Sequence, residues 1–220
     1  MKIGDIDIEF LGHSGFLIRN RKRIVIDPYK IKDIGKVDLI LITHGHYDHC
    51  SIEDIEKIIQ EGTTIVMPAD CQSKIARFKT PVKLVVVEPG QEFILNDLSI
   101  TAFPAYNLDK DFHKKDNEWV SYLIKMNDIL IYHAGDTDVI PEMQKLTGHK
   151  TNGKKFVALL PVGGRFTMNA EEAVEAVKLI KPDIAIPMHY GSIVGDDKDA
   201  EEFVELCKEN NIDARILKKE

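Results

Sequence analysis

The chain has 220 residues and a mass of 24.9 kDa, which is enough for a substantial core and ordinary for one domain. Its 44% hydrophobic and 30% charged residues are typical of a soluble globular protein, and its apolar runs are too short to span a bilayer. A net charge of -7 and a pI near 5.6 argue against nonspecific binding to nucleic acids.

The first half of the chain is predicted to be mainly strands. Short apolar or β-branched runs separated by turn residues indicate strands at Ile6–Leu11, Phe16–Arg19, Arg23–Ile26 and Val37–Ile42. Ser51 and Asp54 indicate the start of a helix, and isoleucines at helical spacing continue it to Ile59. Further strands are expected at Thr64–Met67, Leu84–Val87 and Leu98–Ala102, with a short helix at Cys71–Phe78.

The second half is predicted to alternate strands with helices. Strands are expected at Val120–Lys125, Ile129–His133, Lys155–Leu160, Ile184–Pro187 and Ala214–Leu217. Asn169 and Glu172 fit a capping box for a helix that ends at Ile180, and Ala200–Glu209 fits a last amphipathic helix. Hairpins followed by strand–helix alternation predict an α+β or α/β fold in a single domain over residues 1–220.

The N-terminus and the cysteines bear on the compartment. The first residues lack the apolar stretch of a signal peptide, and Cys50, Cys71 and Cys207 show no C-x-x-C spacing. We therefore expect a cytoplasmic protein with reduced thiols.

A cluster of metal-binding residue types follows the strand predicted at Val37–Ile42. Three imidazoles and one carboxylate occur within six residues, as His44, His46, Asp48 and His49. In an extended segment residues i and i+2 project to the same side, so His44 and His46 can converge on one ion. Asp48 and His49 follow one short turn later and can serve a second ion. Imidazole and carboxylate suit zinc and related metals, which make a hydroxide at neutral pH and so hydrolyse their substrates.

The Thr43–His49 block resembles the signature of the metallo-β-lactamase superfamily of metal-dependent hydrolases. This resemblance implies a four-layer αββα sandwich of two similar halves, with the metals at one edge. It also implies that Asp136, in a Gly-Asp-Thr segment, bridges two metals, and that His189 completes the second site with Asp48 and His49. In isolation, a Gly-Asp-Thr segment would indicate only a turn.

The sequence leaves open which residue is the third ligand of the first metal. The family usually has a His where this chain has Asn107, followed by His113. Either Asn107 is a weak ligand, or His113 reaches back from its loop, or one metal position stays open. We favour Asn107 near the first metal, with His113 binding substrate or carrying a proton. One or two Zn²⁺ ions are the expected cofactor. Because an amide oxygen binds zinc less tightly than imidazole does, Mn²⁺, Fe²⁺ or Ni²⁺ are the alternatives.

Three further residues are candidates for roles beside the metal. A Gly-His-Ser turn at His13 resembles the branch of L-ascorbate-6-phosphate lactonase-like proteins and N-acyl-phosphatidylethanolamine phospholipase D. His13 is expected at the rim of the site, or as a hydrogen-bonded turn residue. Asp27 is expected to accept the distal N–H of a metal-bound histidine. Arg165, in the loop Gly163–Thr167, either binds a phosphate or carboxylate of the substrate or lies in solvent.

Together these predictions indicate that the protein is a metal-dependent hydrolase that acts on a small ester, lactone or phosphodiester. A metal-bound hydroxide near Asp136 attacks the substrate, and Asp48 is a ligand that also holds this nucleophile in line. A small molecule is the expected partner, and the sequence also allows a homo-oligomer. One alternative is a metal-binding regulatory or scaffolding protein without turnover. Another is a metal-centred redox enzyme, but flavodiiron proteins carry Glu where this chain has His46.

Overall fold

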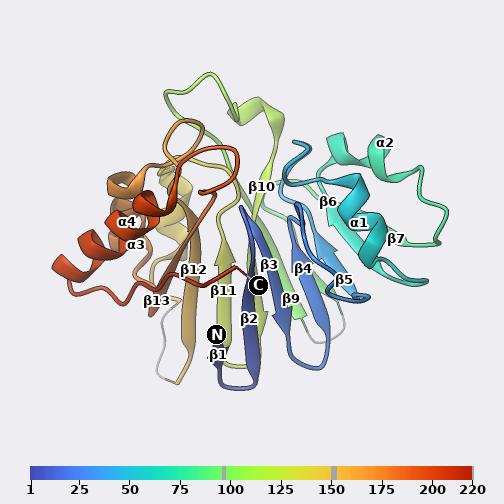
Figure 1. Cartoon of the computed structure of the whole chain (residues 1–220), viewed down its shortest axis with the longest axis horizontal. Coiled ribbons are helices and arrows are strands. Elements are labelled where there is room, and N and C mark those ends of the chain that lie inside the picture. Colours follow the sequence, from blue (N-terminus) through green and yellow to red (C-terminus); the bar gives the residue numbers. More distant parts are fainter. Residues whose placement is uncertain (96–97, 150–152, 220) are drawn as a thin grey trace. The chain divides into compact units, whose positions relative to one another are not determined.

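The computed structural model of this chain describes residues 1–95, 98–149 and 153–219 (Figure 1). The chain forms two compact units, which are Met1–Glu88 with Leu217–Glu220, and Pro89–Ile216. The single domain expected over residues 1–220 stays a prediction.

The first unit is built on a seven-stranded mixed sheet in which the strand order equals the chain order. Its strands are β1 (Lys2–Ile3), β2 (Ile6–Gly12), β3 (Gly15–Arg19), β4 (Arg23–Ile26), β5 (Leu39–Leu41), β6 (Thr64–Met67) and β7 (Lys83–Val86). Strands β1 to β4 pair antiparallel through short turns, and β4 to β7 pair parallel through longer connections. All three residues of β5 are buried, as expected for a parallel strand inside a sheet.

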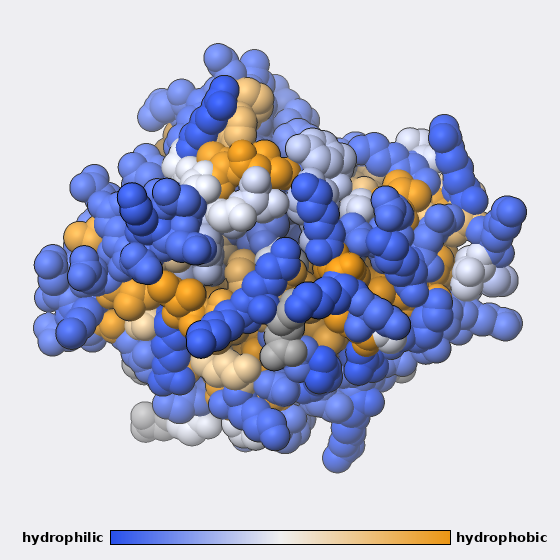
Figure 2. All heavy atoms as spheres, in the orientation of Figure 1, coloured by the Kyte–Doolittle hydropathy of each residue, from blue (hydrophilic) through white to orange (hydrophobic). Residues whose placement is uncertain are grey.

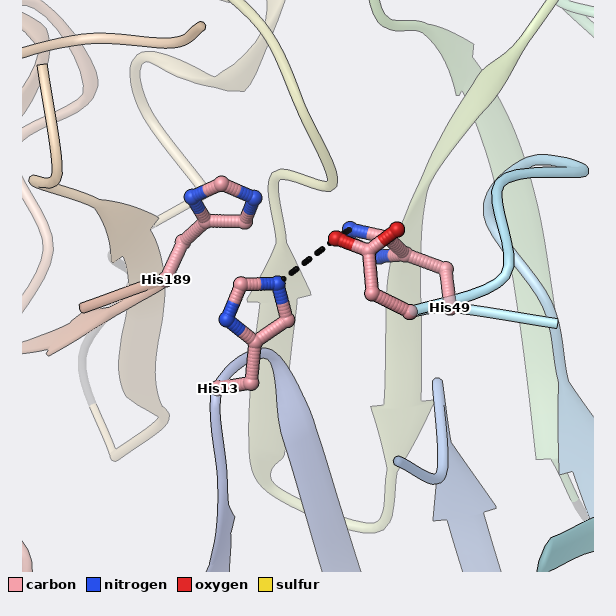
Figure 3. A group of neighbouring side chains, drawn as sticks. His13, His49 and His189 are labelled. Atoms are coloured by element: carbon pink, nitrogen blue, oxygen red, sulfur yellow. Dashed lines mark hydrogen bonds and ion pairs between the residues drawn. The ribbon is translucent and has the colours of Figure 1, made fainter. Parts of the chain in front are cut away.

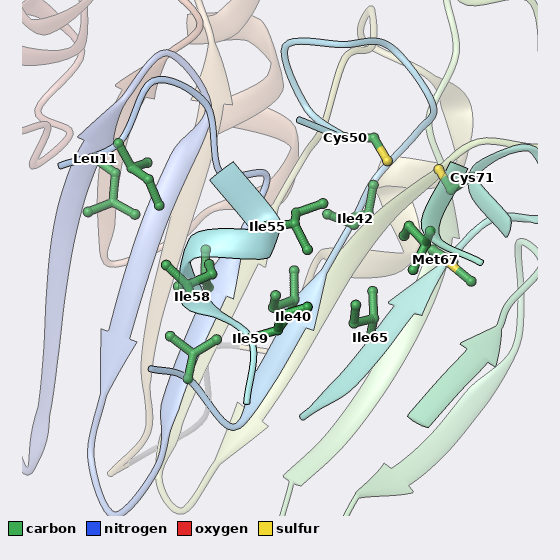
Figure 4. Packing of buried hydrophobic residues seen from close by; sticks show 14 of the residues in the cluster. Leu11, Ile40, Ile42, Cys50, Ile55, Ile58, Ile59, Ile65, Met67 and Cys71 are labelled. Carbon is green, nitrogen blue, oxygen red and sulfur yellow. The ribbon is translucent and has the colours of Figure 1, made fainter. Parts of the chain in front are cut away.

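Helices of the first unit pack on the parallel part of its sheet (Figure 4). Helix α1 (Ile52–Ile58) begins at Ser51, whose side chain accepts from the backbone N–H of Asp54. The 3₁₀ helix η1 (Ala69–Cys71) continues into α2 (Gln72–Ile75). The core they share is almost entirely aliphatic, and its buried members include Ile40, Ile42, Ile55, Ile58, Ile65 and Met67. The buried face of α1 thus holds down the segment that follows β5.

The second unit repeats this plan with a six-stranded sheet in the order β13-β12-β11-β10-β9-β8. Its strands are β8 (Glu92–Leu95), β9 (Leu98–Pro104), β10 (Val120–Met126), β11 (Ile129–His133), β12 (Lys155–Pro161) and β13 (Ile184–Met188). Strands β8 to β11 pair antiparallel, and β11 to β13 pair parallel. Each unit therefore has four antiparallel strands followed by parallel ones, in agreement with the two similar halves expected from the sequence.

The helices of the second unit are η2 (Lys115–Asn117), η3 (Pro141–Leu146), α3 (Ala170–Ile180) and α4 (Asp197–Glu209). The predicted capping box of α3 is present, since Asn169 Oδ1 accepts from the Glu172 N–H while the Glu172 carboxylate accepts from the Asn169 N–H. Within this unit α3 and α4 lie beside β12 and β13 (Figure 1).

Most predicted elements are confirmed, and the differences have local causes. The closing strand predicted at Ala214–Leu217 is wrong, because this segment pairs with β13 only around Ala185 and leaves a single bridge. Helix α4 begins three residues before the predicted start, because Asp196 caps it. The short strands β1 and β8 and the 3₁₀ helices η2 and η3 were not predicted.

Among the described residues, no helix is long and apolar enough to cross a membrane. Hydrophilic residues cover much of the face drawn in Figure 2, and hydrophobic residues occupy separate smaller areas of it.

Candidate metal centre

The histidine block of the first unit forms a tight turn between β5 and α1. The backbone N–H of Cys50 donates to the carbonyl oxygen of His46 at 2.7 Å, and the N–H of His49 donates to the same oxygen at 3.1 Å. His44 and His49 are buried at 1% and 0% exposure. Because aliphatic residues before and after the turn are anchored in the core, these polar side chains are held in place by the packing on either side.

The ring nitrogens of His44 and His46 approach each other as the i, i+2 spacing predicts. The distance from His44 Nε2 to His46 Nδ1 is 3.0 Å. Two nitrogens that bind one zinc ion at about 2.0–2.1 Å in a tetrahedron lie about 3.3 Å apart. The pair therefore fits two neighbouring corners of a coordination shell.

A second group in this unit consists of His13, Asp48 and His49, whose ligand atoms lie within 4.8 Å of one another. His13 Nε2 is 2.9 Å from Asp48 Oδ2, and His49 Nε2 is 3.6 Å from the same oxygen. Figure 3 shows His13 at the turn after β2, with its contact drawn as a dashed line. The sequence placed His13 at the rim of the site, whereas here its imidazole takes part in a candidate ligand group.

Asp27 fixes the orientation of His49. Its Oδ2 is 2.8 Å from His49 Nδ1 and accepts the Thr43 hydroxyl at 2.6 Å, while its Oδ1 accepts the Thr43 backbone N–H at 2.8 Å. The Nδ1–H of His49 therefore donates to the carboxylate, and His49 Nε2 keeps its lone pair. A buried lone pair that faces the Asp48 carboxylate is unfavourable unless a cation or proton lies near both. These donors fit a metal ion, although the role of Asp27 stays a prediction.

The second unit gathers its candidate ligands around Asp136, which follows β11 and is 3% exposed. Asp136 Oδ2 lies 3.2 Å from His113 Nε2 and 3.1 Å from His189 Nε2. His189 extends from the end of β13 with a positive φ of 60° (Figure 3). One carboxylate oxygen thus meets two imidazole nitrogens at separations typical of ligands that share an ion.

Asn107 lies beside His113, with its amide nitrogen 3.2 Å from His113 Nδ1, and the hydrogen bonds of the two residues distinguish them. The Asn107 amide donates its two hydrogens to the carbonyl oxygens of Phe112 at 2.9 Å and Phe166 at 2.7 Å. His113 Nδ1 is 3.0 Å from the Phe166 oxygen, and because the amide hydrogens are used, the His113 Nδ1–H must donate there. His113 Nε2 therefore turns a lone pair toward Asp136.

The amide oxygen of Asn107 is buried and has no hydrogen-bond partner among the described residues. Asn107 Oδ1 and His113 Nε2 are thus both available to an ion. His113 is the stronger candidate ligand, because imidazole binds zinc more tightly than an amide does. Which of the two completes the first site stays a prediction.

Arg165 is exposed and lies outside this cluster of ligands. Its guanidinium stacks over the ring of Phe166 at 5.0 Å, and Phe112 meets that ring edge-on at 4.7 Å. Phe166 supplies the carbonyl oxygen that fixes His113 and Asn107. Arg165 therefore sits on the loop whose Phe166 carbonyl oxygen holds His113 and Asn107, and its part in substrate binding stays a prediction.

Two tyrosines flank the candidate ligands with their phenols held neutral. Burial raises the pKa of Tyr190, next to His189, to about 12, with a further contribution from the Asp197 carboxylate. Partial desolvation and the negative charge of Asp48 raise the pKa of Tyr47, although this side chain is 64% exposed. Near neutral pH both groups therefore remain protonated hydrogen-bond donors.

The sequence did not reveal two features that support these ligands. Thr43 holds Asp27 through both its N–H and its hydroxyl, and this hydroxyl is also 3.0 Å from His44 Nδ1. Gly163 lies so close to the backbone of His189 that an added Cβ would be 2.3 Å from its carbonyl oxygen. A Thr directly before the histidine block was the only available signal for the first feature, and the second had none.

Comparison with known proteins places the chain in a family. The model of the beta-lactamase superfamily domain matches residues 7–189, a span that contains all the candidate ligands. A UPF0173 metal-dependent hydrolase of Pyrococcus furiosus is 36% identical over 214 residues, covering 93% of each chain. The chain belongs to the UPF0173 metal-dependent hydrolases of the metallo-β-lactamase superfamily. It is therefore a metal-dependent hydrolase, and the predicted fold class is confirmed.

Solved structures agree with this membership. The metallo hydrolase Igni18 from Ignicoccus hospitalis has a TM-score of 0.77 at 25% identity, covering 97% of this chain and 95% of its own. A protein from Parabacteroides distasonis has a TM-score of 0.82 at 28% identity, covering 97% of this chain and 94% of its own. These likenesses extend over nearly the whole chain and concern the superfamily, whereas the lactonase-like branch expected from the turn at His13 has no support from them.

Proposed function

We propose that this hydrolase uses a zinc-type centre of one or two ions to cleave a small ester, lactone or phosphodiester. The proposed ligands are those expected from the sequence, with His13 and His113 added from the geometry of each unit: His13, His44, His46, Asp48, His49, His113, Asp136 and His189. Asn107 is kept as a weaker candidate. A bound ion supplies Lewis acidity and activates water at neutral pH.

The observation that carries this proposal is the environment of Asp136. A carboxylate oxygen at 3% residue exposure meets two imidazole nitrogens at 3.1 and 3.2 Å, and one of these imidazoles, His113, already donates its other N–H to a carbonyl oxygen. Burying such a carboxylate is costly unless it binds a cation. If Asp136 had a purely structural role, an ordinary hydrogen-bond donor would be enough to satisfy its carboxylate.

The protein groups have separate tasks in the proposed reaction. The carboxylates of Asp48 and Asp136 accept hydrogen bonds from the attacking water and so orient it toward a carbonyl carbon or a phosphorus atom. Asp27 keeps the proton of His49 on Nδ1, so that the lone pair of Nε2 can coordinate an ion. No serine or cysteine nucleophile is required, and the substrate binds as a small molecule.

The test combines metal analysis with turnover. Asp136→Ala should lose bound metal and abolish hydrolysis of a panel of esters, lactones and phosphodiesters, with circular dichroism unchanged. Asp128→Asn, in the exposed turn between β10 and β11, is the control and should behave as wild type. Undiminished turnover or full metal content in Asp136→Ala would refute the assignment.

A second pair of variants distinguishes the candidates for the remaining ligand. If His113 is the ligand, His113→Ala should lose more metal than Asn107→Ala, whereas the opposite order would restore Asn107 as the ligand. Full metal binding by the wild-type protein, with no turnover on any substrate in the panel, would favour the alternative of a regulatory or scaffolding protein.

A further inference from the structure

Two cysteine thiols face each other in the core of the first unit. Cys50 lies between His49 and the N-cap of α1, and Cys71 ends η1. Their side chains are turned toward one another, although 21 positions separate them in the chain (Figure 4). Both belong to the aliphatic core cluster, with exposures of 2% and 0%.

The two thiols are close enough to interact with each other, and their sulfur atoms face one another in Figure 4. The Cys71 thiol also donates to Asp70 Oδ1 at 3.6 Å. Two thiols that face each other in this way can form a disulfide, provided that the backbone allows its bond length and dihedral angle. An ordinary packing role would be filled equally well by alanine or valine, which could not form this contact.

The two cysteines belong to segments that both contact the turn of candidate ligands. The backbone N–H of Cys50 donates to the carbonyl oxygen of His46. The Lys74 ammonium donates to the carbonyl oxygen of Gly45, and an added Cβ on Gly45 would lie 2.4 Å from Asp70 Oδ2. A covalent bond from Cys50 to Cys71 would therefore tie this turn to residues 69–75.

We propose that Cys50 and Cys71 are a modification site at which a peroxide closes a disulfide. One thiol attacks a peroxide oxygen, breaks the O–O bond and becomes a sulfenic acid, and one water leaves. The other thiol then attacks this sulfur, an S–S bond forms, and the sulfenic oxygen leaves as a second water. The two sulfurs lose two electrons in total, the peroxide gains them, and both thiol protons end in water.

The chain contains an internal control for this proposal. Cys207 lies on α4 and is as deeply buried as Cys71, but it is the only cysteine in the second unit. If burial alone governed oxidation, the three cysteines would react alike. If the presence of a second thiol opposite the first governs oxidation, Cys50 and Cys71 should be oxidised together while Cys207 stays reduced.

The test treats the purified full-length protein with hydrogen peroxide, alkylates the remaining thiols under denaturing conditions, and maps the peptides by mass spectrometry without reduction. We expect the linked pair Cys50–Cys71, a loss of two hydrogen atoms from the intact mass, and alkylation of Cys207 alone. Dithiothreitol should reverse the change. The Cys207→Ala protein should still form the link, and Cys50→Ser should not.

Several outcomes would overturn the proposal. These are alkylation of both Cys50 and Cys71 after peroxide treatment, conversion of either to a sulfinic acid without a link, or a link that contains Cys207. If the Cys50→Ser protein folds poorly, the peptide maps of the wild type and of Cys207→Ala still distinguish the expected link from each of these outcomes.

Discussion

The substitution Asp27→Asn isolates the effect of one buried carboxylate on metal binding. Asparagine has the shape of aspartate and tolerates the left-handed backbone, so the φ of 43° at this position adds little strain. The carboxylate accepts three hydrogen bonds, two from Thr43 and one from His49. If the amide oxygen keeps the bond to the Thr43 N–H, the amide NH₂ faces His49 Nδ1.

An NH₂ group at this position favours the other tautomer of His49. Nδ1 would then accept the hydrogen bond, and the proton would move to Nε2, the nitrogen proposed to bind metal. Loss of one charge-assisted hydrogen bond costs about 1.5–3 kcal/mol, which is a factor of about 10–150 in an equilibrium constant. Substitutions of this kind of supporting carboxylate lower metal affinity about 10- to 100-fold. We therefore expect the zinc affinity of Asp27→Asn to fall by one to two orders of magnitude.

The assay is a competition between the apoprotein and a fluorescent zinc chelator at pH 7. Asp33→Asn is the matched control, because it removes the same charge from an exposed position of the same unit and can still accept the N–H of Gly35. Wild-type affinity in Asp27→Asn would refute the tautomer argument. An equal loss in both variants would show that net charge, and not the contact with His49, governs binding.

Three further predictions concern packing and pH. Gly163→Ala should displace the His189 backbone, lower stability by about 1–3 kcal/mol and reduce metal content; unchanged melting and metal analysis would contradict the close approach. Burial raises the pKa of Asp54, but hydrogen bonds from the Ser51 hydroxyl, the Lys30 backbone N–H and the Lys57 ammonium outweigh this effect and hold the pKa below its usual 3.8. This contribution is present above pH 3.8 and is lost as the pH falls through the folded-state pKa. Urea titrations should therefore show that Asp54→Ala is less stable than wild type at pH 7. The difference in free energy of unfolding should narrow at low pH, and a difference that widens there would contradict this role of Asp54. Ile40→Ala, at 0% exposure, should cost about 2–5 kcal/mol by denaturant unfolding, against about 0.5 kcal/mol or less for Ile94→Ala at 73% exposure; similar losses would rule out a core role for Ile40.

The elements that the sequence predicted well are those whose signals are local. The cap at Ser51 and the capping box at Asn169 depend on neighbours three residues away, so their helices begin where predicted. The prediction of a closing strand at Ala214–Leu217 was wrong, because pairing with β13 depends on a distant partner and extends no further than Ala185. Propensity within a short window contains no information about such a partner.

For the candidate metal centre, the sequence alone predicted the ligand block His44–His49, because residues two apart on an extended segment project to one side, and its role in metal binding stays a prediction. It also indicated Asp136 and His189 through their resemblance to family motifs. Only the tertiary structure decided that His13 contacts Asp48 and that His113 turns Nε2 toward Asp136. Both contacts join residues that are far apart in the chain, and the orientation of His113 is set by hydrogen bonding to another segment, through its Nδ1–H and the Phe166 carbonyl oxygen. The direction of an imidazole lone pair depends on those bonds, and a sequence pattern does not contain them.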